Sequence, residues 1–370
     1  MGPDQPVIWF TGTCGTARVS SVPQPMASDL KLGLNTGYWS AGPPPGAVEA
    51  VEEAERLGFD SMWTAEAYGS DVLTPLAWWG SHTSTLRLGT AIMQMSARQP
   101  TAAAMAALTM DHLSGGRFML GLGVSGPQVV EGWYGMEFAK PLSRTREYVD
   151  IVRQAFRRER VTSDGPHYPL PLPGGTGLGK PLKPTIHPLR EDIPIFLGAE
   201  GPKNIALAAE LCDGWLALFY SPRHEAFYRE ALSEGFAREG ARRSFDDFEV
   251  TATVPVVLGD DVERCADFLR PMYALYFGGM GARDKNFHRD VAVRMGYEEE
   301  AMKITDLYLD GKKDEAAAAV PTELVEQLAL VGPADKVKDD LEAWRESIVT
   351  TMLIGGDAAT LRTVAELVNG

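Results

Sequence analysis

Residues 118–133 read FMLGLGVSGPQVVEGW and contain the pattern G-x-G-x-x-G, formed by Gly121, Gly123 and Gly126. An apolar run precedes the pattern and a helix-like segment follows it, which is the context of a dinucleotide-binding fingerprint. Such a fingerprint normally opens its domain on the first strand. Three strand–helix units precede the pattern here, so we interpret it as the end of a later strand in another α/β fold.

Outward from this stretch, the chain alternates between apolar runs and helical patterns. The apolar runs predict buried parallel strands, and amphipathic segments such as 46–59 predict the helices between them. Eight such units predict a (β/α)8 TIM barrel that forms a single domain over residues 30–370, whereas a doubly wound sheet would use about six strands. The expected strands are 30–37, 61–66, 86–93, 117–125, 193–200, 214–219, 248–259 and 351–356.

Three segments do not follow this alternation. Residues 161–192 are dense in proline and glycine and predict a long loop after the fourth strand. Residues 281–331 predict a mostly helical insertion after the seventh strand. We expect residues 1–29 to be a disordered leader, because their short apolar core and uncharged start do not form a signal peptide.

The composition of the 370-residue chain narrows its class. Its 35 Lys and Arg against 50 Asp and Glu give a net charge of −15, which argues against nucleic-acid binding. No apolar run approaches the ~20 residues of a membrane helix, so no membrane partner is expected. The three widely separated cysteines have no metal-ligand spacing, and we expect no metal site and a reducing cytoplasmic compartment.

In a (β/α)8 barrel the functional groups lie at the carboxyl ends of the strands. The expected fourth and fifth strands both lead into Gly-Pro before a helix, where exposed N–H groups favour an anion. Lys203 adds a positive charge beside the second of these loops. The candidate residues at the strand ends are Tyr38 and Trp39, Glu66 and Tyr68, Ala91 and Ile92, the loop Gly123, Val124, Ser125 and Gly126, and the loop Gly198, Ala199, Glu200 and Gly201.

Glu66 is the acid at the end of the expected second strand, and two roles are open for it. It can donate a proton or polarise a substrate as a catalytic group. It can instead cap a neighbouring helix or pair with an arginine as a structural group. His167 and His187 lie in the long loop and are further candidates for acid–base chemistry, although no pattern requires that role.

Several of these segments together resemble the luciferase-like (bacterial luciferase-type) oxidoreductase superfamily, and most closely its coenzyme F420-dependent branch. The resemblance runs from about Leu30 to Leu367 and is carried by GFDSMWTAEAYGSD, RLGTAI, DHLSGGRFMLGLGVSGPQVVEGWYG and PIFLGAEGPKNIALAAELCDGW. It implies a (β/α)8 barrel with a non-prolyl cis peptide at Ala91–Ile92, behind the cofactor ring. The loop 123–126 would hold the side chain of the cofactor, and the loop 198–201 with Lys203 would hold its phosphate.

The resemblance also implies an activity. The chain would be an F420-dependent oxidoreductase that transfers a hydride between C5 of the deazaflavin and a small organic substrate, and it would form a homodimer. Tyr38, Trp39 and Tyr68 would shape the substrate pocket. Two alternatives stay open, an FMN-dependent monooxygenase of the same superfamily and a cofactor-binding relative without catalytic activity.

One departure from the family pattern limits this expectation. The sugar-phosphate dehydrogenases of the family place an Asp-His pair at the end of the second strand, where this chain has Glu66 and Ala67. The substrate and the proton donor therefore stay open. F420 carries several negative charges, so we expect a basic rim, for which the candidates are Lys140, Arg144, Arg146, Lys180, Lys183, Arg190 and Lys203.

Overall fold

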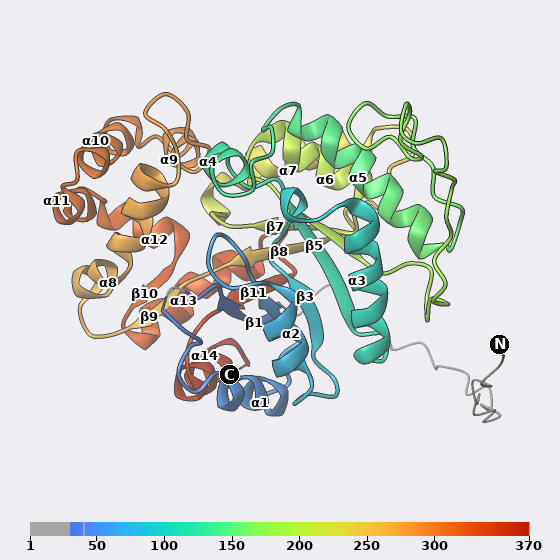
Figure 1. Cartoon of the computed structure of the whole chain (residues 1–370). Helices are drawn as coiled ribbons and strands as arrows, with labels where there is room; N and C mark the ends of the chain where they lie inside the picture. The colour runs from blue at the N-terminus through green and yellow to red at the C-terminus, as the bar shows by residue number, and fades with distance from the viewer. Residues whose placement is uncertain (1–29, 40, 370) are drawn as a thin grey trace.

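A computed structural model describes residues 30–39 and 41–369, and the expected leader over residues 1–29 lies outside the described residues. Eight parallel strands form a closed barrel with helices around it, which confirms the predicted (β/α)8 architecture (Figure 1). Pairing between β3 and β5 closes the ring. In spatial order the barrel strands are β3 (Arg87–Thr90), β2 (Ser61–Thr64), β1 (Lys31–Gly37), β11 (Thr351–Ile354), β8 (Glu249–Thr253), β7 (Gly214–Ala217), β6 (Ile195–Gly198) and β5 (Phe118–Gly123).

Helices cover the outside of the barrel because each one presents an apolar face to it. In α1, for example, Ala50, Val51 and Ala54 recur at helical spacing and are buried. The helices around the barrel are α1 (Ala47–Arg56), α2 (Leu73–Gly80), α3 (Pro100–Leu113), α4 (Pro127–Gly132), α5 (Pro141–Phe156), α6 (Pro202–Leu211), α7 (Glu225–Phe236), α13 (Ala334–Arg345) and α14 (Ala358–Asn369).

Two aromatic rings fill the interior of the barrel. Trp63 on β2 and Phe196 on β6 lie edge to face, with ring centroids 5.2 Å apart and an interplanar angle of 75°. Each ring occupies the space above a glycine of the next strand, since a methyl group on Gly89 would overlap Trp63 and one on Gly214 would overlap Phe196. The barrel interior is therefore a packed core, as is usual for this fold.

The long loop expected over residues 161–192 is present between α5 and β6. It contains no helix or strand. An isolated antiparallel bridge joins Ser163 to Leu170 within it. The carboxylate of Glu147 on α5 accepts hydrogen bonds from the N–H groups of His167 and Tyr168 and fixes this end of the loop.

The expected strand 248–259 is two strands, and in this respect the prediction was wrong. The chain leaves the barrel after β8, and β9 (Val256–Leu258) pairs instead with β10 (Leu330–Gly332) in a separate parallel sheet. Pro255 stands between the two strands and has no N–H group to donate to a sheet. The apolar pattern runs through the break, because both strands are packed against cores.

Residues 256–332 form a helical lobe beside the barrel (Figure 1). The lobe begins earlier than the expected boundary at residue 281, because side chains such as Leu269, Tyr273 and Phe277 form one core with the later helices. Its elements between β9 and β10 are α8 (Val262–Ala274), the π-helix η3 (Leu275–Gly279), α9 (Arg289–Arg294), α10 (Glu298–Leu309), α11 (Lys313–Ala318) and α12 (Thr322–Leu328).

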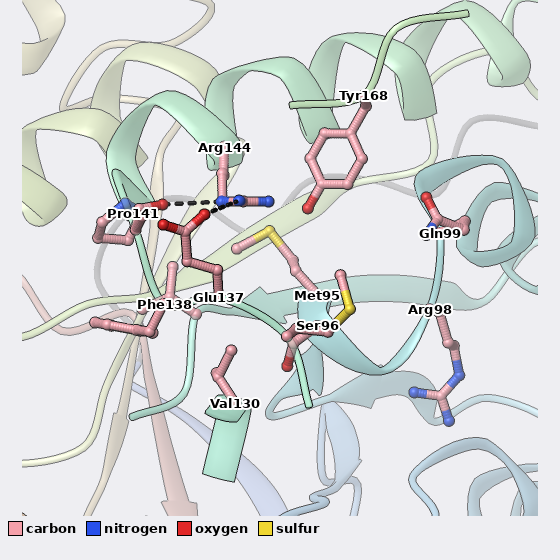
Figure 2. A pocket seen from close by; sticks show the side chains of 13 residues that line it. Met95, Ser96, Arg98, Gln99, Val130, Glu137, Phe138, Pro141, Arg144 and Tyr168 are labelled. Atoms are coloured by element: carbon pink, nitrogen blue, oxygen red, sulfur yellow. Dashed lines mark hydrogen bonds and ion pairs between the residues drawn. The ribbon is translucent and has the colours of Figure 1, made fainter. Parts of the chain in front are cut away.

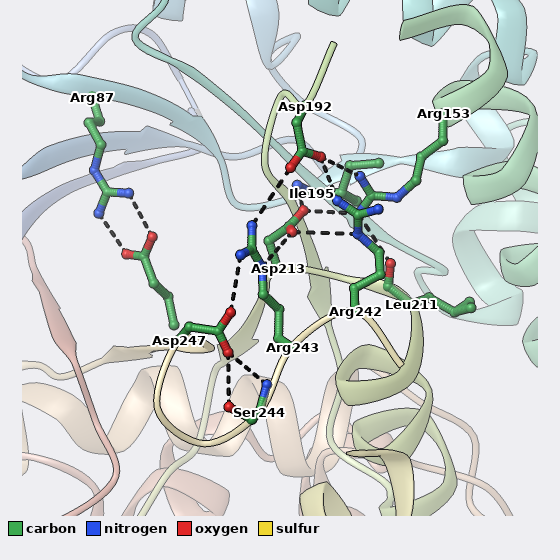
Figure 3. Close-up of polar contacts among 11 residues, drawn as sticks. Arg87, Arg153, Asp192, Ile195, Leu211, Asp213, Arg242, Arg243, Ser244 and Asp247 are labelled. Carbon is green, nitrogen blue, oxygen red and sulfur yellow. Dashed lines mark hydrogen bonds and ion pairs between the residues drawn. The ribbon is translucent and has the colours of Figure 1, made fainter. Parts of the chain in front are cut away.

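Partly and fully buried ion pairs hold the amino end of the barrel (Figure 3). Arg87 at the start of β3 donates to Glu249 at the start of β8, with distances of 2.8 and 2.7 Å, and also pairs with Asp60. Because β3, β2, β1, β11 and β8 are consecutive in the ring, this ion pair crosses the barrel. In TIM barrels this end serves stability, whereas the other end carries the site.

Asp213, just before β7, is the centre of a second cluster at the same end. Its carboxylate accepts from Arg153 and from the Ile195 N–H at 2.9 Å each, and from Arg243 at 3.0 Å. Burial alone would raise the pKa of Asp213, but Arg153 and the Ile195 N–H lower it below its ordinary value. The ionised carboxylate thus joins the starts of β6 and β7 to α5.

We expect the substitution Asp213→Asn to lower the free energy of unfolding by about 3 kcal/mol, because it leaves the buried Arg153 with the more distant and exposed Asp192 as its remaining counter-charge. Urea unfolding at pH 7 measures this change. The matched control is Asp247→Asn, which removes an exposed partner of Arg243 and should cost less than about 1 kcal/mol.

The same pair of variants has a pH dependence. A carboxyl whose pKa is lowered by folding stabilises the protein above its unfolded pKa and loses this effect as the pH falls through the folded pKa. The difference between wild type and Asp213→Asn should therefore be full at pH 7 and shrink below about pH 4. A difference that stays constant down to pH 3 would contradict the role of the ionised carboxylate.

Candidate active site

The peptide bond Ala91–Ile92, after β3, is cis, as the resemblance implied. The side chain of Ile92 fills space that two glycines leave: a methyl group on Gly123 would lie 2.5 Å from its Cδ1, and one on Gly198 would lie 2.9 Å from its Cγ2. Ala91 and Ile92 pack on the aromatic filling of the barrel and remain partly exposed. Three segments chosen from the sequence thus meet here, in a surface that we call the floor: Ala91–Ile92, Gly123 and Gly198.

Glu66, after β2, pairs with an arginine and caps a helix, which are the contacts expected of a structural acid rather than a catalytic one. Its carboxylate accepts two hydrogen bonds from Arg98, at 2.6 and 3.1 Å, and one from the N–H of Gln94 at 2.8 Å. It also accepts from the N–H of Val72, the residue that caps α2. The side chain is 4% exposed. These contacts occupy both oxygens of an ion-paired carboxylate and favour a positioning role over proton donation.

A cavity opens between the loops that follow β4 (Met93–Gln94) and β5 (Figure 2). It encloses about 510 Å³, counted to its open mouth. Among the predicted loop residues, Val124 lines the cavity, Ser125 adopts a positive φ of 58° and Gly126 caps α4. The side chains that dominate its wall are Met95, Ser96, Val130, Phe138, Arg144 and Tyr168.

The second predicted loop, after β6, has a buried first part and an accessible second part. Ala199 is buried, and its carbonyl accepts a hydrogen bond from the Trp215 ring at 2.8 Å. Gly201 caps α6 with open space around it, since nothing lies within 4 Å of a methyl group placed there, and Lys203 is exposed. The side chain of Glu200 pairs with His288, so its contacts do not suit the phosphate role expected for this residue.

The predicted aromatic residues lie at the strand ends in different settings. Trp39 packs against Trp79 of α2, with ring centroids 5.7 Å apart, which favours a packing role. Tyr68 is 58% exposed. Tyr38 lies beside Tyr276 of η3, and burial together with the Tyr38 hydroxyl raises the pKa of Tyr276. Tyr38 therefore reaches the helical lobe from the end of β1.

Sequence reasoning missed His288 and Tyr276, which the helical lobe brings to the strand ends. Nδ1 of His288 lies 2.7 Å from Oε1 of Glu200. The imidazole packs edge to face on Tyr276 and on Phe219, with ring centroids 5.0 and 5.8 Å away. His288 lies 88 residues after Glu200, in a segment whose sequence has no motif, so only the fold reveals the contact.

The histidines expected from the long loop are held elsewhere. Nε2 of His167 contacts the hydroxyl of Ser143 on α5 at 3.0 Å. The carbonyl of His187 is bound by His112 on α3 at 2.7 Å. Both residues are thus engaged by helices on the outside of the barrel, and neither belongs to the walls of the cavity.

Ion pairs neutralise part of the basic rim that was expected around the cofactor site. Arg146 pairs with Glu210, and Arg190 pairs with the buried Asp111 at 2.7 Å, so these two arginines hold helices and loops together. Arg144 donates through Nε to the carbonyl of Ala139 at 2.8 Å, but its carboxylate partner Glu137 lies 3.7 Å away and is 75% exposed. Arg144 also points into the cavity (Figure 2).

Within the part of the chain that the structure describes, no helix is long and apolar enough to span a membrane.

Comparisons with known proteins agree with this geometry. The family model described as luciferase-like monooxygenase matches residues 28–351. A provisionally named coenzyme F420-dependent oxidoreductase of Mycobacterium tuberculosis is 59% identical over 347 residues, which cover 93% of this chain and 100% of the relative. The 5,10-methylenetetrahydromethanopterin reductase of Archaeoglobus fulgidus is 29% identical over 82% of this chain and 87% of the reductase.

A solved structure shares the fold. The coenzyme F420-dependent tetrahydromethanopterin reductase of Methanopyrus kandleri superposes with a TM-score of 0.76 at 22% identity, over 92% of this chain and 98% of that chain. The match to the family model covers most of the chain and includes the strand ends of the candidate site. The chain therefore belongs to the luciferase-like monooxygenase family.

Proposed function

We propose that the protein is an F420-dependent oxidoreductase that transfers a hydride between C5 of the deazaflavin and a small organic substrate. The observation that carries this proposal is the floor, where Ile92 packs into the space left by Gly123 and Gly198. These are the segments that the family resemblance associates with the cofactor ring. The name of the Mycobacterium tuberculosis relative, a coenzyme F420-dependent oxidoreductase, supports F420 over FMN.

Buried polar atoms around the floor fit a polar ring. Among the described residues, Oε1 of Gln94, Oγ of Ser96 and Oδ1 of Asn204 are buried without a hydrogen-bond partner. Such atoms are rare, because leaving one unsatisfied costs about 1–3 kcal/mol. Gln94 and Ser96 follow the floor directly, and Asn204, in the first turn of α6, donates to the carbonyl of Gly198 at 3.4 Å, so all three lie next to floor segments.

The anionic part of the cofactor fits the loops beyond the floor. Gly126 and Gly201 each cap a helix that begins with proline, and the start of a helix favours negative charge. Arg144 would bind an anion in the cavity in place of its exposed partner Glu137. Lys203 offers a second positive charge at the start of α6.

The bound deazaflavin would supply the hydride chemistry, and the chain would bind and orient the reactants and exclude water. The floor would support the ring, the loop 123–126 would hold its side chain and the loop 198–201 its phosphate, and the apolar cavity wall would exclude water from one side. Holding the two reactants in a fixed geometry removes much of the entropic barrier to transfer.

The first test is cofactor binding. We expect oxidised F420 to bind the purified protein and to be displaced poorly by FMN, as measured by quenching of F420 fluorescence. Reduced F420 should then be reoxidised by at least one acceptor from a panel of C=C, C=N and C=O compounds. Tight FMN binding with oxygen consumption would instead support the monooxygenase alternative, and cofactor binding without any turnover would support the non-catalytic one.

The second test addresses the loop before α6. The substitution Gly201→Asp places a negative side chain in open space and should weaken F420 binding at least about tenfold through charge repulsion. Folding should be unaffected, because the backbone φ of −86° suits any residue. Gly175→Asp, in the long outer loop, is the matched control and should leave the affinity within about twofold. Equal affinity of both variants would exclude this loop from the cofactor site.

A further inference from the structure

The helical lobe contacts the carboxyl ends of two barrel strands. The strands β1, β2, β3, β5 and β6 are consecutive in the ring, so the ends of β1 and β6 lie on opposite sides of it. Tyr38 follows β1 and lies beside Tyr276 of the lobe, whereas Glu200 follows β6 and binds His288 of the lobe. These contacts place Tyr276 and His288 at the same end of the barrel as the floor.

The backbone holds His288 in this position. The side chain of Asn286 is buried and donates to the carbonyl of Phe277 at 2.8 Å, and its Oδ1 accepts from the N–H of His288 at 3.0 Å. Gly281 allows this approach, since a methyl group there would lie 2.5 Å from Cβ of Asn286. The imidazole is thus tied to η3 by its own backbone as well as to Glu200 by its ring.

The pairing distinguishes the two ring nitrogens of His288. Nδ1 is bound to Glu200, and Nε2 has no hydrogen-bond partner among the described residues. The side chain is 25% exposed, so a small molecule can reach it. A carboxylate on Nδ1 fixes the orientation and tautomer of an imidazole and leaves Nε2 to exchange a proton with a substrate.

The surroundings of His288 are mostly aromatic, with Phe219 and Tyr276 against its faces and edge. Arg294 is engaged by the carbonyl of Glu200 at 2.8 Å and stacks over Phe227. This setting suits an uncharged acceptor better than a phosphorylated one. The titratable and charged groups of the described chain around the pair are Glu200, Tyr38, Tyr68, Tyr228, Tyr276, Arg289 and Arg294.

We propose that His288 is the catalytic proton donor, through Nε2, to an uncharged carbonyl-type or conjugated acceptor held between the floor and the helical lobe, and that Glu200 is its positioning residue. This inference rests on the proposed F420-dependent function. The acceptor double bond gains one hydride, which carries two electrons from the reduced cofactor, and one proton from Nε2. The imidazole becomes neutral and regains its proton from water.

The charge state agrees with this role. Burial alone would lower the pKa of His288, but the charge of Glu200 and its hydrogen bond raise it above the ordinary value. The protonated form therefore persists to a higher pH than in a free histidine, and donation is lost as the pH rises through this pKa. Without the Glu200 charge, the loss should begin at a lower pH.

The first experiment needs no substrate. In protein labelled with ¹⁵N-histidine, the imidazole signals of His288 are identified by their loss in His288→Gln and followed against pH. We expect Glu200→Gln to lower the titration midpoint of His288 by about one pH unit, and F420 to shift the Nε2 signal. The control pair is His82 with Glu52, which lie 3.3 Å apart on the outer surface, and its signals should not respond to F420.

The second experiment measures single-turnover oxidation of reduced F420 by an acceptor that the wild type uses. His288→Gln should slow the reaction about 10²- to 10⁴-fold, with F420 affinity within about twofold, whereas His82→Gln should react like wild type. Glu200→Gln should move the decline in rate to lower pH. His288→Asn provides a second variant if His288→Gln does not fold.

The outcomes separate the two proposals. Failure of F420 binding, or absence of turnover with every acceptor, contradicts the proposed function. The titration then still shows whether Glu200 sets the protonation of His288. An unchanged single-turnover rate in a folded His288→Gln variant overturns the assignment of His288. A His288 signal that responds neither to Glu200→Gln nor to F420 overturns both the positioning and the donor role.

Discussion

The contact between Trp63 and Phe196 inside the barrel is the constraint on which the site depends. The two rings meet at 5.2 Å, and each requires a glycine on the adjacent strand, at Gly89 and Gly214. Packing of this kind leaves no room for a ligand within the barrel. Ala91 and Ile92, which follow β3, pack on the cluster that contains these rings and form the surface above it.

The two ends of the barrel carry different polar groups. At the amino end, Arg87 and Asp213 are centres of ion pairs that hold strand starts together, although Nε of Arg153 and Oγ1 of Thr351 are buried there without a hydrogen-bond partner. At the carboxyl end, Gln94, Ser96 and Asn204 have buried oxygens without partners among the described residues. Polar groups that are buried and unpaired carry a free-energy cost, which a bound ligand would relieve. The floor and the open cavity beside it are the physical basis for placing the proposed function at the carboxyl end.

Much of this architecture could be predicted from the sequence, because buried parallel strands and their helices have distinct periods. The loop ends Gly123–Gly126 and Gly198–Gly201 could also be found, since glycine and proline mark the turns locally. Gly121 lies within β5, where a methyl group would overlap the carbonyl of Thr90, so the first glycine of G-x-G-x-x-G serves barrel closure. The break in 248–259 was missed because the apolar pattern is the same on both sides of it.

The roles of side chains were harder to predict than their positions. Glu66 was correctly placed at a strand end, but its bonds to Val72 and to the segment from Gln94 to Arg98 have no local signature. The contact between Glu200 and His288 depends on the path of the helical lobe, which no periodicity encodes. Tertiary contacts of this kind decide whether an acid is a catalytic group or a structural one.

The measurement that tests the account most directly is a crystal structure of the protein with oxidised F420. The account predicts that the deazaflavin ring lies on Ala91 and Ile92, with its side chain along the loops 123–126 and 198–201 and with His288 on the opposite side of the substrate space. A ring bound away from this surface, or a site that accepts only FMN, would contradict it.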